Sequence, residues 1–294
     1  MKNFCCVLTL FIFYIFFINI VNAKDANYEI LVKRLSDDGF DSSFIENLYN
    51  NNEAVFMPNL IVINVKKDEE RIDYKQYSSD SMIIKSKDYF IEYKKFLKEI
   101  QKEFGIKPEF IVTILLVETR LGTYLGKHKV INVLSSLSVS NKKDAIDDIY
   151  KKYIEDKFLN ENQKLSIDEV AIRVKKRSDW AYKELKIFLK YVLEQNLNPY
   201  EINGSLSGAF GFAQFIPSAV IYYGKDGDKD GNIDMFNHYD AIASIANYLK
   251  GNGWIEEDIP ENKIKSVIET YNHSIYYVNG VYESAIKLKQ KLDN

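Results

Sequence analysis

Apolar residues recur at intervals of three and four along most of this chain, a spacing typical of amphipathic helices that pack on a core. The clearest stretches predict helices over residues 27–35, 41–49, 87–104, 142–160, 178–195, 240–250 and 275–291, with a further short helix after residue 166. Only 13 glycines and 5 prolines interrupt the 294 residues, so few positions break these patterns. The sequence therefore predicts a mainly α (α+β) fold.

Capping residues set the ends of three predicted helices. Gly105 ends the helix over residues 87–104, and Ser166 with Glu169 forms a capping box for the short helix that follows. Asp240 is the predicted N-cap of the helix over residues 240–250.

Two stretches do not follow a clear helical pattern. Residues 51–84 combine Pro58, the β-type run Leu60–Val65 and a polar stretch, and they predict an extended segment across the surface of the main domain. Residues 130–140 are rich in β-branched and small side chains, which suits either a tight helix or a buried connector. The sequence leaves that choice open.

Residues 1–23 predict a signal peptide. Lys2 precedes an apolar run over residues 4–18, and Val21-Asn22-Ala23 has the small-x-small form of a cleavage site. The alternative is an uncleaved anchor, because the uncharged stretch is just long enough to span a bilayer. Cys5 and Cys6 stand before the apolar run, so there is no lipobox, and the mature chain would contain no disulfide.

The remaining length of about 270 residues suits one large domain or two unequal ones. The formal charge is −3, and removal of Lys2 makes it −4. Basic groups such as Lys142-Lys143 are typical of solvated helix faces in a mildly acidic chain. We therefore expect no nucleic-acid partner.

One carboxylate follows the most apolar helix pattern of the chain. Pro108 suits the first turn of a helix, residues 111–117 are apolar except for one threonine, and Glu118 follows directly. Apolar walls favour the protonated form of such a group, and Gly122 and Gly126 open the backbone just beyond it. This arrangement predicts a general acid. The alternative is a solvated glutamate in the last turn of a core helix.

Residues 204–218, with the sequence GSLSGAFGFAQFIPS, keep their side chains small, which allows a ligand or a second backbone to approach closely. Gln214 offers an amide that suits an acetamido or hydroxyl group of a sugar. No Gly-Lys-Ser/Thr or GxGxxG follows, so a phosphate loop is excluded. Ordinary packing around one satisfied buried amide is the alternative.

An acidic segment over residues 226–237 follows the template of a calcium loop, with a glycine at its sixth position and an isoleucine at its eighth. The expected ligands are the side chains or carbonyl groups of Asp226, Asp228, Asp230, Asn232, Asp234 and Asn237. The last of these offers one neutral oxygen where the template has a bidentate glutamate, so the affinity should be low for a loop of this kind. The prediction is a structural Ca²⁺ ion; an acidic surface turn is the alternative.

Five motifs in this order resemble the B-type lytic murein (peptidoglycan) transglycosylases of the bacterial cell envelope. They are ETRLG, GSLSGAFGFAQFIPS, the calcium-type loop, DAIASIANYLKGNGW and YNHS, and the resemblance is clearest over residues 89–281. It implies a goose-lysozyme-like catalytic domain over residues 24–294, with a small β-containing subdomain near residues 222–240 that holds Ca²⁺ in an EF-hand-like loop. It also implies a periplasmic enzyme of a Gram-negative-type bacterium.

The same resemblance implies the substrate and the roles of individual residues. The substrate would be the glycan strands of peptidoglycan, cut at the β-1,4 bond between N-acetylmuramic acid (MurNAc) and N-acetylglucosamine (GlcNAc) with formation of a 1,6-anhydro ring. Cell-wall synthesis or division proteins would be further partners. Glu118 matches the single catalytic acid/base, Ser205 and Gln214 match residues that contact the sugar, and Tyr271 and Asn272 match a motif that lines the cleft.

Departures from the family pattern leave some questions open. Residues 141–176 form an inserted helical segment where the family has an aromatic-rich turn, and we expect this insertion at the rim of the cleft. A lysozyme-type hydrolase would differ only in whether water reaches the intermediate. A calcium-stabilised, non-catalytic glycan-binding or scaffold protein is the third reading, but such a protein would not need Glu118, Gln214 and Tyr271 together.

Overall fold

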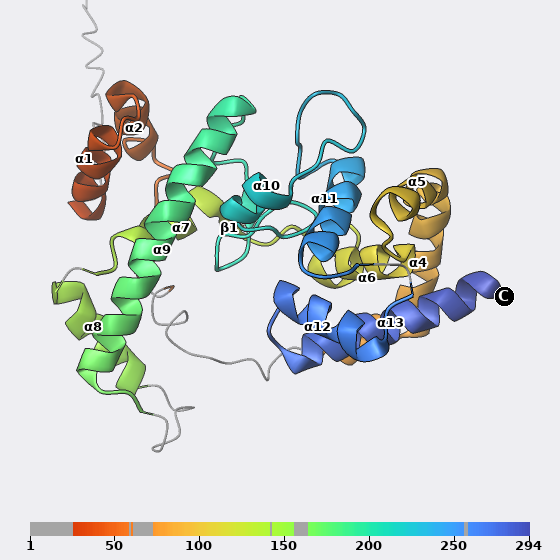
Figure 1. Ribbon diagram of the computed structural model, residues 1–294. Coiled ribbons are helices and arrows are strands. Elements are labelled where there is room, and N and C mark those ends of the chain that lie inside the picture. Colours follow the sequence, from red (N-terminus) through yellow and green to blue (C-terminus); the bar gives the residue numbers. More distant parts are fainter. Residues whose placement is uncertain (1–25, 59, 61–72, 142, 156–163, 256–257) are drawn as a thin grey trace, which may run out of the picture.

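The computed structural model describes residues 26–58, 60, 73–141, 143–155, 164–255 and 258–294 (Figure 1). The predicted signal peptide and nearly all of the β-type run after Leu60 lie outside these residues. No helix in the described part of the chain is long and apolar enough to cross a membrane.

Helices dominate the described structure, as the sequence predicted. In chain order they are η1 (Ala26–Tyr28), α1 (Glu29–Asp37), α2 (Ser42–Tyr49), η2 (Tyr74–Ser78), α4 (Asp80–Glu92), α5 (Lys94–Phe104), α6 (Pro108–Thr119), α7 (Val130–Ser138), α8 (Lys143–Ile154), α9 (Ile167–Glu194), α10 (Pro217–Tyr223), α11 (His238–Gly251), α12 (Glu261–Tyr271) and α13 (Ile275–Asp293). The strands β1 (His128–Lys129) and β2 (Asn203–Gly204) pair antiparallel, with His128 opposite Gly204.

Several helix boundaries differ from the predicted ones. The predicted helix over residues 87–104 is wrong as a single element, because α4 already begins at Asp80 and a break at Tyr93 separates it from α5. The ring of Tyr93 packs 4.6 Å from that of Tyr89 and 5.2 Å from that of His238, measured between centroids. This break therefore depends on contacts with a distant segment, which the local pattern does not show.

The two helices predicted between residues 166 and 195 are a single helix, α9. The predicted capping box at Ser166 is confirmed, and Val170, Val174 and Ser178 continue one buried stripe into the second half of the helix. No glycine or proline interrupts this stripe, so nothing ends the helix. The run that the sequence left open, from residue 130, is a helix, α7.

The C-terminal third holds two further differences. Helix α12 lies in a polar stretch for which no helix was predicted, and it buries Ile264, Val267 and Ile268 on one side. The prediction that Asp240 caps α11 is wrong: Asn237 is the N-cap, and its side chain accepts the N–H of Tyr239.

The central helix is α6, which is apolar on nearly every side and contacts α4, α5, α11 and α13. In Figure 1 it lies between α11 and the pair α4 and α5, with α12 and α13 below. Since a helix buried on all sides has no solvated face, its orientation is fixed by its neighbours. Its last turn is therefore a rigid place for a functional side chain.

A second, smaller cluster of apolar side chains joins α7, α8 and α9. Ile149 and Tyr153 of α8 are buried in it together with Val170 and Val174 of α9. The predicted insertion over residues 141–176 thus comprises α8 and the beginning of α9, so its C-terminal boundary falls inside a continuous helix. Deletion at that boundary would cut α9.

Candidate active site

Glu118 lies in the last turn of α6, where its side chain is partly exposed. Its Oε1 accepts a hydrogen bond from the hydroxyl of Tyr277, with an oxygen–oxygen distance of 2.6 Å. Burial raises the pKa of Glu118 to about 7, and the hydrogen bond from Tyr277 works in the opposite direction, because it favours the ionised form. A large fraction of this carboxyl group is therefore protonated at neutral pH, as the apolar helix predicted.

Tyr277, in α13, contacts Glu118, and no pattern in the sequence predicted this contact. Its side chain is 1% exposed, its ring stacks on Tyr271 at 6.4 Å with an interplanar angle of 10°, and Tyr74 meets it edge-on at 5.7 Å. These aromatic neighbours fix the ring and so fix the hydroxyl that faces Glu118. The residue is 159 positions from Glu118 in sequence, and no local pattern joins the two.

The residues after Glu118 turn the chain sharply. Thr119 is fully buried, and its hydroxyl donates to the carbonyl of Phe212 and accepts the N–H of Gly122. Residues 120–122 all have positive φ, of 50°, 61° and 85°. A Cβ at Gly122 would lie 2.9 Å from Cε1 of His238, so this glycine is required by both conformation and space. Through the contacts of Thr119 and Gly122, the ETRLG motif therefore packs the end of α6 against the loop that carries Gln214.

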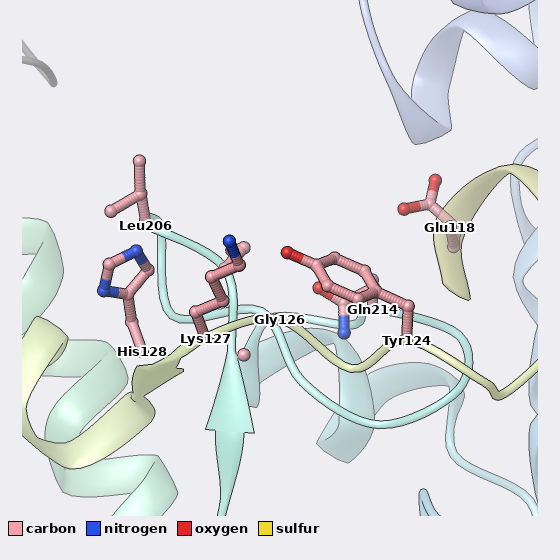
Figure 2. A pocket seen from close by; sticks show the side chains of 9 residues that line it. Glu118, Tyr124, Gly126, Lys127, His128, Leu206 and Gln214 are labelled. Carbon is pink, nitrogen blue, oxygen red and sulfur yellow. The ribbon is translucent and has the colours of Figure 1, made fainter. Parts of the chain in front are cut away.

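A cavity of about 270 Å³ opens beside Glu118. It is lined by Glu118, Tyr124, Gly126, Lys127, His128, Gly204, Ser205, Leu206 and Gln214. Figure 2 shows Glu118 at one end, Lys127, His128 and Leu206 at the other, and Tyr124 and Gln214 between them. An acid and basic groups thus lie at opposite ends of the row of lining residues.

Glycine contacts form the floor of this cavity. A Cβ on Gly126, which has a φ of 93°, would lie 2.2 Å from the carbonyl oxygen of Gly204. A Cβ on Gly204 would in turn lie 2.1 Å from the carbonyl oxygen of Ala209. The small residues thus allow a close approach between backbones around the β1–β2 pair, one of the two uses that the sequence predicted.

The structure brings Ser205 and Gln214 into the same cavity as Glu118. The hydroxyl of Ser205 accepts the N–H groups of Ser207 and Ala209, both at 3.1 Å, and so shapes its turn. Gln214 has a φ of 49° and donates from Nε2 to the carbonyl of Gly211 at 3.0 Å. Both side chains are held in place by the backbone, and their contact with a sugar stays a prediction.

Tyr271 and Asn272 are not among the residues that line the cavity. The hydroxyl of Tyr271 donates to the carbonyl of Ala213, next to Gln214, and its ring packs against Tyr248 at 4.8 Å. The side-chain oxygen of Asn272 accepts the N–H of Ser274. Tyr271 therefore holds the residue next to Gln214 without lining the cavity, and the direct role predicted for this pair stays a prediction.

Three carboxylates of the predicted calcium loop region gather at one point. Asp226, Asp228 and Asp240 each offer an oxygen, and the three atoms lie within 4.8 Å of one another. Asp240 was not among the predicted ligands; it accepts the N–H of Gly227 at 2.8 Å and that of Asp234 at 2.7 Å. Burial is the main cause that raises its pKa. This set of hard oxygen donors fits Ca²⁺, which prefers carboxylate ligands.

The other predicted ligands hold the loop itself. Asp230 accepts the N–H of Asn232, and Asp234 accepts that of Phe236. Asn237, besides capping α11 with its oxygen, donates from Nδ2 to Asp228 at 2.6 Å. The amide oxygen of Asn237 serves as a helix cap, whereas Asp240 offers a carboxylate oxygen near Asp226 and Asp228. Coordination by Asp230, Asn232, Asp234 and Asn237 stays a prediction.

Comparison with known proteins shows which family this chain resembles. The model of the Transglycosylase SLT domain matches residues 23–265. Membrane-bound lytic murein transglycosylase B of Escherichia coli K12 is 29% identical over 170 residues, which are 58% of this chain and 38% of that protein. The matched part is thus well under two thirds of the length of this relative.

Two solved structures share the fold. The E. coli lytic transglycosylase Slt35 in complex with calcium aligns with a TM-score of 0.71 and 20% identity, over 92% of this chain and 95% of that one. SltB3 of Pseudomonas aeruginosa in complex with NAG-NAM-pentapeptide aligns with a TM-score of 0.67 and 18% identity, over 90% and 80%. The mainly helical fold and the resemblance drawn from the five motifs are confirmed, and the chain belongs to the Transglycosylase SLT domain family.

Proposed function

We propose that the protein is a periplasmic lytic murein transglycosylase, which cuts the MurNAc–GlcNAc bond of peptidoglycan and leaves a 1,6-anhydro-MurNAc end. The observation that carries this proposal is the carboxyl group of Glu118, with a pKa of about 7, in the wall of a cavity of about 270 Å³. It is the only carboxylate among the residues described as lining that cavity. The family membership and the glycan fragment bound to the relative SltB3 support the same substrate.

A single carboxyl group is sufficient for this reaction. Protonated Glu118 donates its proton to the glycosidic oxygen as the bond from that oxygen to C1 of MurNAc breaks, while the N-acetyl oxygen of the sugar stabilises C1. The carboxylate then takes the proton from the hydroxyl at O6 as the bond from O6 to C1 forms. Glu118 ends the cycle protonated again. The pKa of about 7 suits both steps, since neither form of the acid is strongly disfavoured.

Tyr277 contributes to the second half of this cycle. Its hydroxyl donates to Glu118, and such a bond favours the carboxylate that exists between the two proton transfers. The ring itself is buried among aromatic side chains, so the hydroxyl stays in position when the charge of Glu118 changes.

The decisive experiment compares Glu118→Gln with Glu103→Gln on purified peptidoglycan. Glutamine keeps the shape of Glu118 but transfers no proton, so activity should fall by about 10²–10⁴-fold. Glu103 is exposed at the end of α5 and outside the cavity, so its variant should retain the wild-type rate. Wild-type turnover by the Glu118→Gln protein, or equal losses at both positions, would end the assignment.

The mass of the product separates the proposed reaction from hydrolysis. An anhydro end is lighter by one water than a reducing end. A product with reducing ends only would identify a lysozyme-type muramidase. A folded wild-type protein that binds glycan and releases no product would instead be the non-catalytic alternative.

We also propose that a structural Ca²⁺ ion binds at Asp226, Asp228 and Asp240. The clustered carboxylates support this site, as does the calcium complex of the relative Slt35. When bound, the ion would neutralise the mutual repulsion of these carboxylates and join the loop to α11. The periplasmic location rests on the predicted signal peptide, and contacts with cell-wall synthesis or division proteins stay a prediction.

A further inference from the structure

His238, the first residue of α11, packs against the two segments that carry Glu118 and Gln214. Its ring stacks on that of Phe212, with a centroid distance of 4.2 Å and an interplanar angle of 23°. It also lies against Gly122, since a Cβ on this glycine would come within 2.9 Å of Cε1 of His238. His238 is not among the residues that line the cavity, so its effect on the reaction would pass through these neighbours.

Phe212 connects the two segments through its backbone. Its carbonyl accepts the hydroxyl of Thr119, the residue after Glu118, at 2.9 Å. It lies in the same loop as Gln214, and its N–H donates to the carbonyl of Met235 at 2.8 Å. Figure 2 shows that the side chains of Glu118 and Gln214 come from separate segments and face one cavity. The position of Phe212 therefore affects the distance between the carboxyl group of Glu118 and the amide of Gln214.

Helix α4 holds the ring of His238 in turn. The hydroxyl of Tyr89 and Nδ1 of His238 form a hydrogen bond of 2.9 Å, and the two rings meet at 66° with centroids 5.3 Å apart. The ring of Tyr93 lies 5.2 Å from the same imidazole. The backbone of His238 is fixed as well, because Asn237 caps the helix that begins there. The imidazole is thus held between α4 on one side and the catalytic turn on the other.

We propose that His238 is a positioning residue, which holds the turn after Glu118 and the loop of Gln214 at the separation that the reaction requires. This inference rests on the proposed function, because it concerns the geometry of the proposed catalytic acid. A misplacement of about 1 Å at a reacting group can lower a rate by about 10²-fold. Since Glu118 acts in the chemical step, loss of this contact should lower kcat more than it changes KM.

The test measures kcat and KM on soluble peptidoglycan chains, at a temperature well below the melting transition of each variant. His238→Ala should lower kcat by about tenfold or more and change KM by less than about twofold. His238→Phe keeps a ring of similar size against Phe212 and Gly122, so it should restore kcat to within about threefold of the wild-type value.

Tyr239, the next residue of α11, provides the matched control. Its ring packs 5.5 Å from that of Tyr93 and 5.0 Å from that of Phe96, and these two are its ring contacts among the described residues. Tyr239→Ala therefore removes an aromatic side chain from the same helical turn without changing the contact with Phe212. It should lower the melting temperature and leave kcat and KM at their wild-type values.

A second variant, Tyr89→Phe, keeps the ring of Tyr89 and removes only the hydroxyl that orients the imidazole. It should lower kcat about threefold, and the double variant with His238→Phe should show no further fall, because both changes remove the same hydrogen bond. A purely structural role would lower the melting temperature without this pattern in kcat.

Several results would overturn the positioning role and leave the assignment of Glu118 intact. They are a wild-type kcat in a folded His238→Ala protein, a change in KM alone, and an equal fall of kcat in Tyr239→Ala. If His238→Ala does not fold, a wild-type kcat in Tyr89→Phe would overturn the role. A wild-type protein that releases no glycan fragment would instead refute the proposed function.

Discussion

The hydrogen bond between Tyr277 and Glu118 predicts how activity depends on pH. Replacement of Tyr277 by phenylalanine removes a hydroxyl that donates to Oε1 over 2.6 Å and keeps the buried ring. This donor favours the ionised form of Glu118, so its loss should raise the pKa of the acid above the wild-type value of about 7. A hydrogen bond to a charged group contributes about 1.5–3 kcal/mol, which corresponds to a pKa rise of about one to two.

Because Glu118 must be protonated to start the reaction, activity falls as pH rises through its pKa. The alkaline limb of the profile of kcat/KM should therefore move to higher pH by about one to two units in Tyr277→Phe. The assay is release of soluble glycan fragments from peptidoglycan between about pH 5 and pH 9, with mass detection of the product ends. A larger share of the maximal rate should remain at alkaline pH, even if the maximum itself is lower.

The neighbouring residue provides the control. Tyr276 is 53% exposed, and the hydroxyl bonded to Glu118 belongs to Tyr277, so Tyr276→Phe should leave the profile of the wild type unchanged. If a folded Tyr277→Phe protein keeps the wild-type alkaline limb, or if the limb moves to lower pH, the hydrogen bond does not control the acid and the reasoning is wrong.

Three further predictions concern stability. The pKa of Glu118 is raised from 4.5 to about 7, so the folded state binds more protons than the unfolded state between these values. The wild type therefore loses stability as pH rises through this range, by at most about 3 kcal/mol. The melting temperature of Glu118→Gln should be higher than that of the wild type at about pH 8 and equal to it at about pH 4. Calcium at a hundred times its dissociation constant should add about 2.7 kcal/mol, which raises the melting temperature by about 5–10 °C, and Asp240→Asn should abolish this increase. Gly126→Ala should cost more than about 2 kcal/mol in urea unfolding, because its Cβ would overlap the carbonyl oxygen of Gly204.

Each of these three outcomes can be contradicted, and two of them have a matched variant. For the acid, equal melting temperatures of Glu118→Gln and the wild type at pH 8 would contradict the raised pKa. For calcium, Asp148→Asn on the exposed side of α8 should keep the full increase in melting temperature. A wild type with the same melting temperature in chelator and in millimolar calcium would refute the site. For the cavity floor, Gly39 has the same φ of 93° with open space around it, so Gly39→Ala should show only the smaller conformational cost. Equal costs at both glycines would rule out the overlap.

The sequence by itself determined the local elements and the chemistry of single segments. Because α6 is apolar on all sides, its pattern placed Glu118 at the end of a buried helix and predicted the direction of its pKa. The small residues from 204 to 218 indicated a close backbone approach, and the spacing of the acidic residues indicated a loop that gathers carboxylates. Each of these conclusions depends on residues that are close together in the chain, and the sequence shows those directly.

The tertiary structure decided which distant residues meet. Tyr277 contacts Glu118 across 159 positions, and only the packing of α13 on α6 brings its hydroxyl there. Asp240 had the features of a helix cap, yet the fold of the loop turns it toward Asp226 and Asp228 and leaves the cap to Asn237. Nothing in the sequence distinguished Lys127 from the other lysines, and it lines the cavity because Gly126, the residue before it, packs against Gly204. Side-chain spacing follows from the sequence, but the meeting of separate elements depends on how their buried faces pack together.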